Sequence, residues 1–124
     1  MDKNSGLLIS VEGIDGSGKS TLVLALAELL EGSGKEIIVT REPGKTQLGK
    51  KIRNILHQEK NLVCDKAEFL LFAADRAQHF EEVVIPALKK NKIIISDRMA
   101  DSSIAYQGFG RGLDISMIKK VNKW

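Results

Sequence analysis

Short apolar runs alternate with longer stretches of helical periodicity along this chain. Three runs rich in leucine, isoleucine and valine occupy residues 7–11, 37–40 and 93–96, with little polar interruption. Such runs are typical of strands that are buried on both faces of a parallel sheet. The first run ends in a glycine-rich turn, and the second is broken by Pro43 and Gly44. The pattern therefore predicts three buried strands joined by helical segments.

Between the strands, apolar side chains recur at the spacing of one helix face. Gly32 and Gly34 end the first helix. Asp65 followed by Glu68 is a capping-box pattern that predicts the start of a longer helix, and Pro86 should bend or restart that helix. Four helices are expected, over residues 20–31, 48–57, 65–84 and near 114–120.

The alternation of strands and helices predicts an α/β fold of three layers, in which helices cover both faces of a parallel sheet. The chain has 124 residues, which suits a single domain spanning residues 1–124. Because three strands make a thin sheet, we expect that one edge lacks its natural neighbours. The first strand would then expose a poorly covered side.

Composition narrows the class of protein. Charged residues make up 28% and apolar residues 43% of the chain, the balance of an ordinary globular protein. The net charge of +3 suits phosphate ligands but is too small to predict a nucleic-acid-coating surface. Cys64 is the only cysteine, which excludes an internal disulfide and fits a reducing compartment such as the cytoplasm. No run approaches the roughly 18 apolar residues of a membrane span, and the polar start does not resemble a signal peptide.

The turn after the first strand carries the clearest chemical motif. Residues Gly13–Ser20 match G-x-x-x-x-G-K-[ST] at every fixed position and lie between a predicted strand and a predicted helix. Glycines let phosphate oxygens approach the backbone, successive N–H groups form an anion nest, and the helix adds its positive end. Lys19 supplies a cation for the β- and γ-phosphates of ATP, and Ser20 supplies a hydroxyl ligand for Mg²⁺. A chance glycine-rich turn is the alternative.

The motif alone does not name the second substrate, because GTPases, motor ATPases and small-molecule kinases share it. Several clusters follow at the ends of predicted strands, where open α/β sheets bind ligands. Phe72 and Arg76 lie four residues apart and share a helix face, so a ring and a guanidinium can together bind a base. The predicted ATP-binding residues are Gly13, Ile14, Asp15, Gly16, Ser17, Gly18, Lys19, Ser20 and Thr21, and the further candidates are Arg41, Glu42, Arg53, Phe72, Arg76, Asp97, Arg98, Ser102, Ser103, Tyr106 and Gln107.

Each candidate also has a purely structural interpretation. On spacing alone, Phe72 is more typical of a core residue. Arg76 is more typical of a surface ion pair, for which Glu42 is a candidate partner. Asp97–Arg98 could be a strand-end ion pair, and Tyr106 a half-buried packing residue. Two histidines, expected on helix surfaces, are assigned no role: His57 and His79.

In order and spacing, these motifs resemble the thymidylate kinase family. The family's first motif resembles residues 9–21, ISVEGIDGSGKST, and its second resembles TREPG at residues 40–44, with Thr46, Gly49 and Ile52-Arg53 after it. Its third resembles LLFAADR at residues 70–76. Its fourth resembles Asp97-Arg98 followed by Ser102, residues 105–108 and residues 111–112. Four ordered motifs from about Leu7 to the last residue are much more specific than a P-loop alone.

The resemblance implies a P-loop NTPase fold and transfer of a phosphoryl group from ATP, with Mg²⁺, to thymidine 5′-monophosphate. Phe72 would stack on the thymine ring and Arg76 would bond its O4 edge. Lys19, Arg98 and Asp15 form the implied catalytic set, with Asp15 at the sugar 3′-hydroxyl and Asp97 organising Mg²⁺ through water. The other implied contacts are Gln107 with Ser102 or Ser103 near the base, Tyr106 against the sugar, and Arg41, Arg53 and Arg98 around the acceptor phosphate with Glu42 beside it.

The resemblance further implies a cis peptide bond between Glu42 and Pro43, and a homodimer formed through the helices near residues 48–57 and 68–84. Three positions depart from the family pattern. Lys45 replaces a second glycine, Met99 replaces an aromatic residue, and Ser17 leaves the P-loop without an arginine. Enzymes of the family without that arginine place a basic group in a later lid.

Family chains continue well past the position of Trp124, with further strands, the lid and C-terminal helices. We therefore expect this chain to correspond to the N-terminal part of a kinase, with weak or absent turnover alone. A non-catalytic fragment that binds nucleotide and dimerises is one alternative function. A GTPase-like switch is another, but the chain contains no guanine-reading Asn-Lys-x-Asp.

Overall fold

The computed structural model describes residues 5–13, 18–58, 62–98, 112 and 114–123. Its sheet contains three parallel strands, β1 (Leu7–Val11), β2 (Ile37–Arg41) and β3 (Ile93–Asp97), in the order β1-β3-β2. The register pairs Val11 with Asp97 and Asp97 with Arg41, so the three strands end level with one another. The predicted parallel α/β arrangement is confirmed, and the segments that follow the strands meet at one edge of the sheet.

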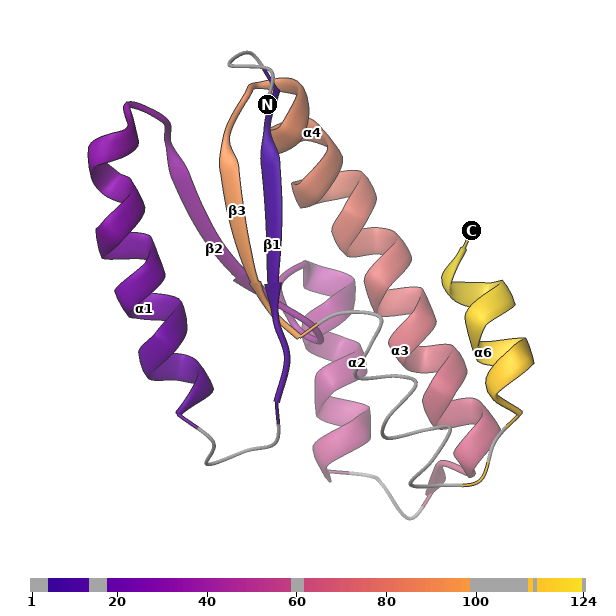
Figure 1. Ribbon diagram of the computed structural model, residues 1–124. Coiled ribbons are helices and arrows are strands. Elements are labelled where there is room, and N and C mark those ends of the chain that lie inside the picture. Colours follow the sequence, from indigo (N-terminus) through magenta and orange to yellow (C-terminus); the bar gives the residue numbers. More distant parts are fainter. Residues whose placement is uncertain (1–4, 14–17, 59–61, 99–111, 113, 124) are drawn as a thin grey trace.

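Helices cover both faces of this sheet (Figure 1). Helix α1 lies on one side, while α2, α3 and α4 lie on the other, and α6 lies beyond α3 (Figure 1). The helical elements are α1 (Lys19–Leu30), the 3₁₀ turn η1 (Glu31–Ser33), α2 (Gln47–Gln58), α3 (Asp65–His79), the π-helical turn η3 (Phe80–Val84), α4 (Ile85–Lys89) and α6 (Ile115–Asn122).

Two apolar clusters lie on opposite faces of β3, because successive side chains of a strand point to opposite faces. Ile94 is fully buried and packs with Val84 and Ala87 at the start of α4. Ile95 is fully buried and packs with Val11 and with Val23 of α1. The central strand is therefore buried on both faces, as its uninterrupted run of isoleucines predicts.

The long helix predicted over residues 65–84 exists, but its beginning differs from the expectation. Cys64 is the N-cap and no side chain caps the helix, so the capping box predicted for Asp65 and Glu68 is wrong. The chain turns π-helical over Phe80–Val84 and resumes as α4, with Pro86 in its first turn. Because proline lacks an N–H and crowds the carbonyl four residues earlier, the restart lies where Pro86 predicts it.

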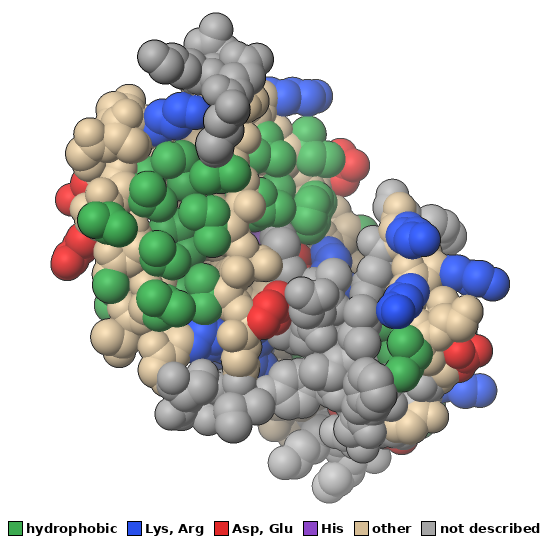
Figure 2. All heavy atoms as spheres, viewed as in Figure 1, with side chains coloured by type: hydrophobic (Ala, Val, Ile, Leu, Met, Phe, Trp, Pro, Cys, Tyr) green, Lys and Arg blue, Asp and Glu red, His purple; other side chains and the backbone are tan. Residues whose placement is uncertain are grey.

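Strand β1 is an edge strand of the described sheet, since its only partner among these residues is β3. Figure 2 shows hydrophobic side chains gathered on the face over β1 and α1. Three leucines of α1 are more than half exposed to solvent: Leu22, Leu24 and Leu29. In the part of the chain that the structure describes, no helix is both long and apolar enough to cross a membrane.

Candidate active site

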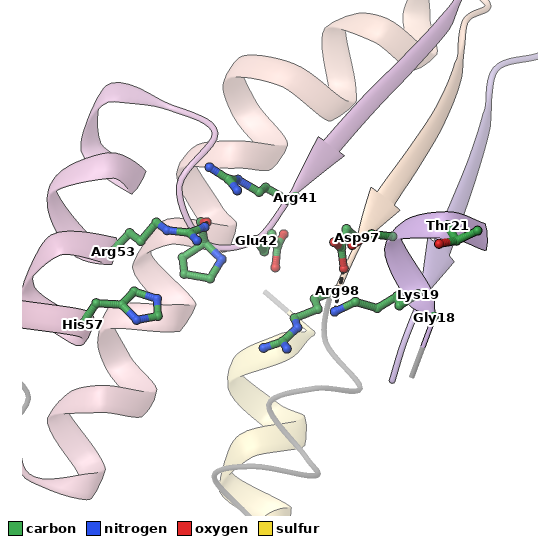
Figure 3. Close-up of a pocket in the computed structure, with 11 residues that line it drawn as sticks. Gly18, Lys19, Thr21, Arg41, Glu42, Arg53, His57, Asp97 and Arg98 are labelled. Atoms are coloured by element: carbon green, nitrogen blue, oxygen red, sulfur yellow. Dashed lines mark hydrogen bonds and ion pairs between the residues drawn. The ribbon is translucent and has the colours of Figure 1, made fainter. Parts of the chain in front are cut away.

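A cavity of about 390 Å³ lies at the carboxyl ends of the strands. Figure 3 shows that α1 and the end of β3 form one side of it, whereas α2 and the segment after β2 form the other. Four permanently charged cations and two carboxylates contribute to its lining, so the cavity favours an anionic ligand. The lining residues are Gly18, Lys19, Ser20, Thr21, Arg41, Glu42, Pro43, Arg53, His57, Asp97 and Arg98.

The start of α1 forms the first side. Gly18 is the N-cap in a left-handed conformation, with φ of 84°, and no side chain caps the helix. Because glycine has no side chain, the N-cap residue itself satisfies none of the first N–H groups of α1, which are the groups that bind anions at helix N-termini. Lys19 is buried, and its Nζ lies 2.8 Å from Asp97 Oδ1. This ion pair holds the ammonium group at the mouth of the cavity (Figure 3).

The turn after β3 fixes Arg98. Its backbone is left-handed, with φ of 72°, a conformation that costs free energy for a residue other than glycine. Two hydrogen bonds stabilise it: Arg98 N–H donates to Val11 O at 3.0 Å, and buried Ser96 Oγ donates to Arg98 O at 3.0 Å. The arginine is therefore held at the rim by the strand ends on both sides of it.

The segment after β2 forms the opposite side of the cavity. The Glu42–Pro43 peptide bond is cis, as the family resemblance implies. Gly44 follows with φ of 116°, and its N–H donates to Asp75 Oδ1 at 3.1 Å. Arg53 of α2 donates from Nη1 to Pro43 O at 3.2 Å. Residues 42–46, here called the acceptor loop, are thus tied to both α2 and α3.

A chain of polar contacts is buried beneath the acceptor loop. Arg76 Nε lies 2.8 Å from Glu42 Oε2, and His79 Nδ1 lies 3.0 Å from Glu42 Oε1. The other ring nitrogen, His79 Nε2, lies 2.6 Å from Thr40 Oγ1. All four residues are buried. The Glu42 carboxylate therefore has a partner on α3 for each of its oxygens.

Asp75 is buried beside these polar contacts. Burial raises the pKa of its carboxyl above the ordinary value, and the charge of Glu42 adds to the increase. The Gly44 N–H opposes the shift most, and the electrostatic influence of His79 and Arg76 opposes it further. The carboxylate also leaves no room for a side chain at position 49, because a Cβ on Gly49 would lie 2.3 Å from Asp75 Oδ1. Close contact between α2 and α3 thus depends on Gly49.

Comparison with known proteins adds an independent observation. The sequence profile of the thymidylate kinase family matches residues 11–124, which is nearly the whole chain. The chain belongs to the thymidylate kinase family. It is 56% identical over 119 residues to the thymidylate kinase of Halothermothrix orenii, an alignment that covers 96% of this chain and 58% of that protein.

Other thymidylate kinases give the same result. The enzyme of Kosmotoga olearia is 52% identical over 118 residues, which are 95% of this chain and 57% of that protein. A crystal structure of thymidylate kinase from Ehrlichia chaffeensis superposes with a TM-score of 0.90 at 42% identity, covering 96% of this chain and 67% of that one. The chain thus spans somewhat more than half the length of these two curated relatives.

The described residues of the thymidylate kinase motifs lie in three places: at the cavity, on α3 and after β1. The cavity brings together most of the predicted phosphate-binding set: Gly18, Lys19, Ser20, Thr21, Arg41, Glu42, Arg53, Asp97 and Arg98. Half-buried Phe72 and buried Arg76 lie on α3 and do not line this cavity. Gly13 follows β1. Eight predicted residues lie outside the described part of the chain: Ile14, Asp15, Gly16, Ser17, Ser102, Ser103, Tyr106 and Gln107.

Several structural interpretations of these residues need correction. Arg76 does pair with Glu42, but the pair is buried rather than at the surface. Asp97 pairs with Lys19. His79 was expected on a helix surface, yet 1% of it is exposed and both ring nitrogens have partners. His79 lies three residues after Arg76 and shares its helix face, so the burial of that face accounts for both residues.

Sequence reasoning also missed two contributors to the site. His57 is exposed, as expected, but it lines the cavity four residues after Arg53 on α2. Asp75 lies within the quoted LLFAADR motif, between Phe72 and Arg76, but the sequence analysis assigned it no role. Its role emerges only from the tertiary contact with Gly44, which no local pattern reveals.

Proposed function

We propose that this chain carries the phosphoryl-transfer site of a thymidylate kinase, which phosphorylates thymidine 5′-monophosphate with ATP to give the diphosphate for dTTP synthesis. One observation above all supports the proposal: separate elements contribute four cations to one cavity at the sheet edge. They are Lys19 of α1, Arg41 of β2, Arg53 of α2 and Arg98 after β3. A site for two phosphorylated substrates needs such convergent positive charge.

In this proposal, the P-loop side holds ATP and the acceptor-loop side holds the monophosphate. Lys19 neutralises the β- and γ-phosphates, while Arg41, Arg53 and Arg98 orient the acceptor phosphate. An oxygen of that phosphate attacks the γ-phosphorus, the bond to the β–γ bridging oxygen breaks, and ADP leaves with that electron pair. The acceptor is already anionic, so no general base is required. Catalysis consists of alignment and neutralisation of charge.

The residues present also suit Mg²⁺, which needs few protein ligands because phosphates and water complete its shell. The Ser20 hydroxyl and the Asp97 carboxylate both line the cavity beside Lys19. Among the described residues, no group of three or more His, Cys, Asp or Glu side chains is placed to hold a metal ion. When bound there, Mg²⁺ supplies positive charge to the β- and γ-phosphates.

Recognition of the thymine base remains part of the proposal. Phe72 would stack on the ring and Arg76 would bond the O4 edge, supported by their place on the α3 face that adjoins the acceptor loop. Further expected contacts are Asp15 at the 3′-hydroxyl, Tyr106 against the sugar, and Gln107 with Ser102 or Ser103 near the base.

We also propose a homodimer that works in the cytoplasm. Helices α2 and α3 each leave a leucine substantially exposed, Leu48 and Leu70, in the region that the family resemblance assigns to the dimer contact. Apolar side chains of this kind favour burial against a second copy. Sedimentation equilibrium would test this: a single species of 13.7 kDa at micromolar concentration would contradict it.

The central experiment is a coupled assay of ADP release with ATP, Mg²⁺ and a panel of nucleoside monophosphates. We expect thymidylate to be preferred over deoxyuridylate, which lacks one methyl group, by roughly 10–200-fold in kcat/KM. Calorimetric titration with thymidylate and ATP distinguishes a catalytic chain from the alternative, a fragment that binds nucleotide without turnover. Binding without turnover would identify a nucleotide-binding fragment, and binding of neither nucleotide would contradict the proposal.

A further inference from the structure

His79 is a buried polar residue that the proposed mechanism does not use. It is the last residue of α3, 1% of it is exposed, and it does not line the cavity. Its ring nevertheless joins two residues of the segment that leads into the cavity, Thr40 near the end of β2 and Glu42 just after it. The imidazole therefore lies behind the wall of the proposed acceptor site.

The hydrogen-bonding capacity of these groups fixes the direction of the contacts. An ionised carboxylate can only accept, so His79 Nδ1 carries a proton and donates it to Glu42 Oε1 at 3.0 Å. In a neutral imidazole, Nε2 then accepts from the Thr40 hydroxyl at 2.6 Å. Arg76 Nε donates to the remaining oxygen, Glu42 Oε2, at 2.8 Å. Glu42 is thus held at both oxygens by side chains from one face of α3.

This arrangement constrains more than Glu42 itself. The Glu42 N–H donates to Asp97 O at 3.1 Å, which joins the acceptor loop to the end of β3. Since Arg76 engages Glu42 through Nε, rotation of its guanidinium would break that bond. The orientation of the Arg76 guanidinium therefore depends on the position of the Glu42 carboxylate, and that position depends on His79.

We propose that His79 is a positioning residue for the acceptor site, which acts through Glu42 to orient Arg76 and the acceptor loop. The inference rests on the proposed function for its substrate, thymidylate. It assigns Glu42 a structural task in place of direct contact with the acceptor phosphate. An apolar residue could fill the same volume, but it would leave Glu42 Oε1 and Thr40 Oγ1 buried without this partner.

Two near-isosteric variants separate the two contacts of the ring. The amide of His79→Asn lies where Nδ1 lies and can still donate to Glu42. The amide of His79→Gln lies farther out, where Nε2 lies, and can reach only Thr40. We expect His79→Asn to keep thymidylate affinity within about twofold, and His79→Gln and His79→Leu to lose about tenfold, the equivalent of one unsatisfied buried group.

Affinity for ATP serves as the internal control, because Lys19 and Gly18 have no contact with His79 among the hydrogen bonds and ion pairs above. ATP affinity should stay the same in all three variants. As a further control, substitution of the exposed Lys66 on the same helix, Lys66→Ala, should change the affinity for neither nucleotide. If His79→Gln lowers the melting temperature while thymidylate affinity stays at the level of His79→Asn, the role is only structural and the proposal is wrong. Should His79→Leu not fold, the Asn and Gln pair still decides.

Nitrogen NMR of the His79 ring tests the contact without any substrate. The proposal requires a proton on Nδ1 at neutral pH, and its ¹⁵N shift should report that proton. An Nδ1 without a proton would overturn the proposal, whatever the chain binds. If wild-type chain instead shows the Nδ1 proton but binds no thymidylate, the proposed function fails while the His79–Glu42 contact stands, so the two failures are distinguishable.

Discussion

The P-loop side of the cavity and the acceptor-loop side are held in different ways. On the P-loop side, a backbone turn and one ion pair, Lys19 to Asp97, hold the charged group. The Asp97 side chain is 27% exposed. On the acceptor-loop side, Glu42 and Gly44 are held by buried contacts from α3. An incoming phosphate would compete with one carboxylate in the first arrangement, whereas several contacts within the protein fix the second.

This contrast has a physical basis. Phosphates arrive with their own charge and metal ion, so the P-loop side needs a cation that can exchange its carboxylate partner for phosphate oxygens. A base must be recognised by its edges, which demands fixed donors, and buried hydrogen-bonded networks provide them. Substitutions on the P-loop side should therefore alter turnover, whereas substitutions behind the acceptor loop should alter stability and acceptor affinity.

The largest effect is expected for Lys19→Ala. Removing the cation should reduce turnover of ATP with thymidylate by at least about 10²–10³-fold, the loss typical of one charge-stabilising donor. Thymidylate affinity should change little, because Lys19 has no contact with the acceptor loop among the ion pairs described. The coupled assay and calorimetric titration measure the two quantities. Near-normal turnover in this variant would show that Lys19 is not the phosphate cation.

Gly49→Ala tests the packing behind the acceptor loop. Alanine normally favours a helix over glycine by about 1 kcal/mol. Here its Cβ would lie 2.3 Å from Asp75 Oδ1 and 3.1 Å from Thr46 Oγ1, so α2 and α3 must move apart. We expect the free energy of unfolding to fall by about 1–3 kcal/mol in urea denaturation.

Gly32→Ala is the matched control for that experiment, because a Cβ at this exposed position meets no atom within 4 Å. Its stability should be unchanged or slightly higher, since alanine restricts the unfolded chain. Equal stability of the two alanine variants would contradict the close contact between Gly49 and Asp75.

The same contrast marks what the sequence could predict. The strands, the P-loop and Asp97 follow from local patterns: runs of isoleucine, fixed motif spacing and a charge at a strand end. Accordingly, Gly18, Lys19, Ser20, Thr21 and Asp97, which were predicted from these patterns, line the cavity. The buried links of Asp75 and His79 were not, because each depends on a partner more than 30 residues away. Helical periodicity placed these residues on α3 without indicating what lay opposite them.

The capping box illustrates a different limit. Asp65 and Glu68 have the right types and spacing, but the helix begins one residue earlier than that pattern requires, with Cys64 as the N-cap. Both carboxylates then lie in the first turn, where they still favour the positive end of the helix. A local motif thus located the helix start to within one residue and misassigned the residue that precedes it.

Phe72→Ala would sharpen the assignment of the acceptor side. Base stacking on an aromatic ring contributes about 1–3 kcal/mol, so thymidylate affinity should fall about tenfold or more, with ATP affinity unchanged. Lys66→Ala, at an exposed position of the same helix, is the control and should alter neither. Equal losses for both nucleotides in calorimetry would count against stacking and favour a packing role for the ring.

The smallest effect concerns the pH dependence of stability at Asp75. Because burial raises the pKa of this carboxyl in the folded state, the folded chain binds its proton more tightly than the unfolded chain does. The resulting stabilisation is fully present below the unfolded pKa and is lost as the pH rises through the folded pKa. Asp75→Asn cannot titrate, and its amide oxygen can still accept from the Gly44 N–H.

The quantity to follow is how the difference in melting temperature between Asp75→Asn and wild type changes with pH. Any effect of the substitution that does not depend on pH is the same at every pH and does not contribute to that change. We expect this difference to move in favour of the asparagine variant between pH 4 and pH 7, as the wild type loses the contribution of its bound proton. All other titratable groups are common to both proteins, so their contributions largely cancel. A difference that moved toward wild type with rising pH would mean that Gly44 N–H and Arg76 outweigh burial. In that case the ionised form of Asp75, rather than the protonated form, would stabilise the acceptor loop.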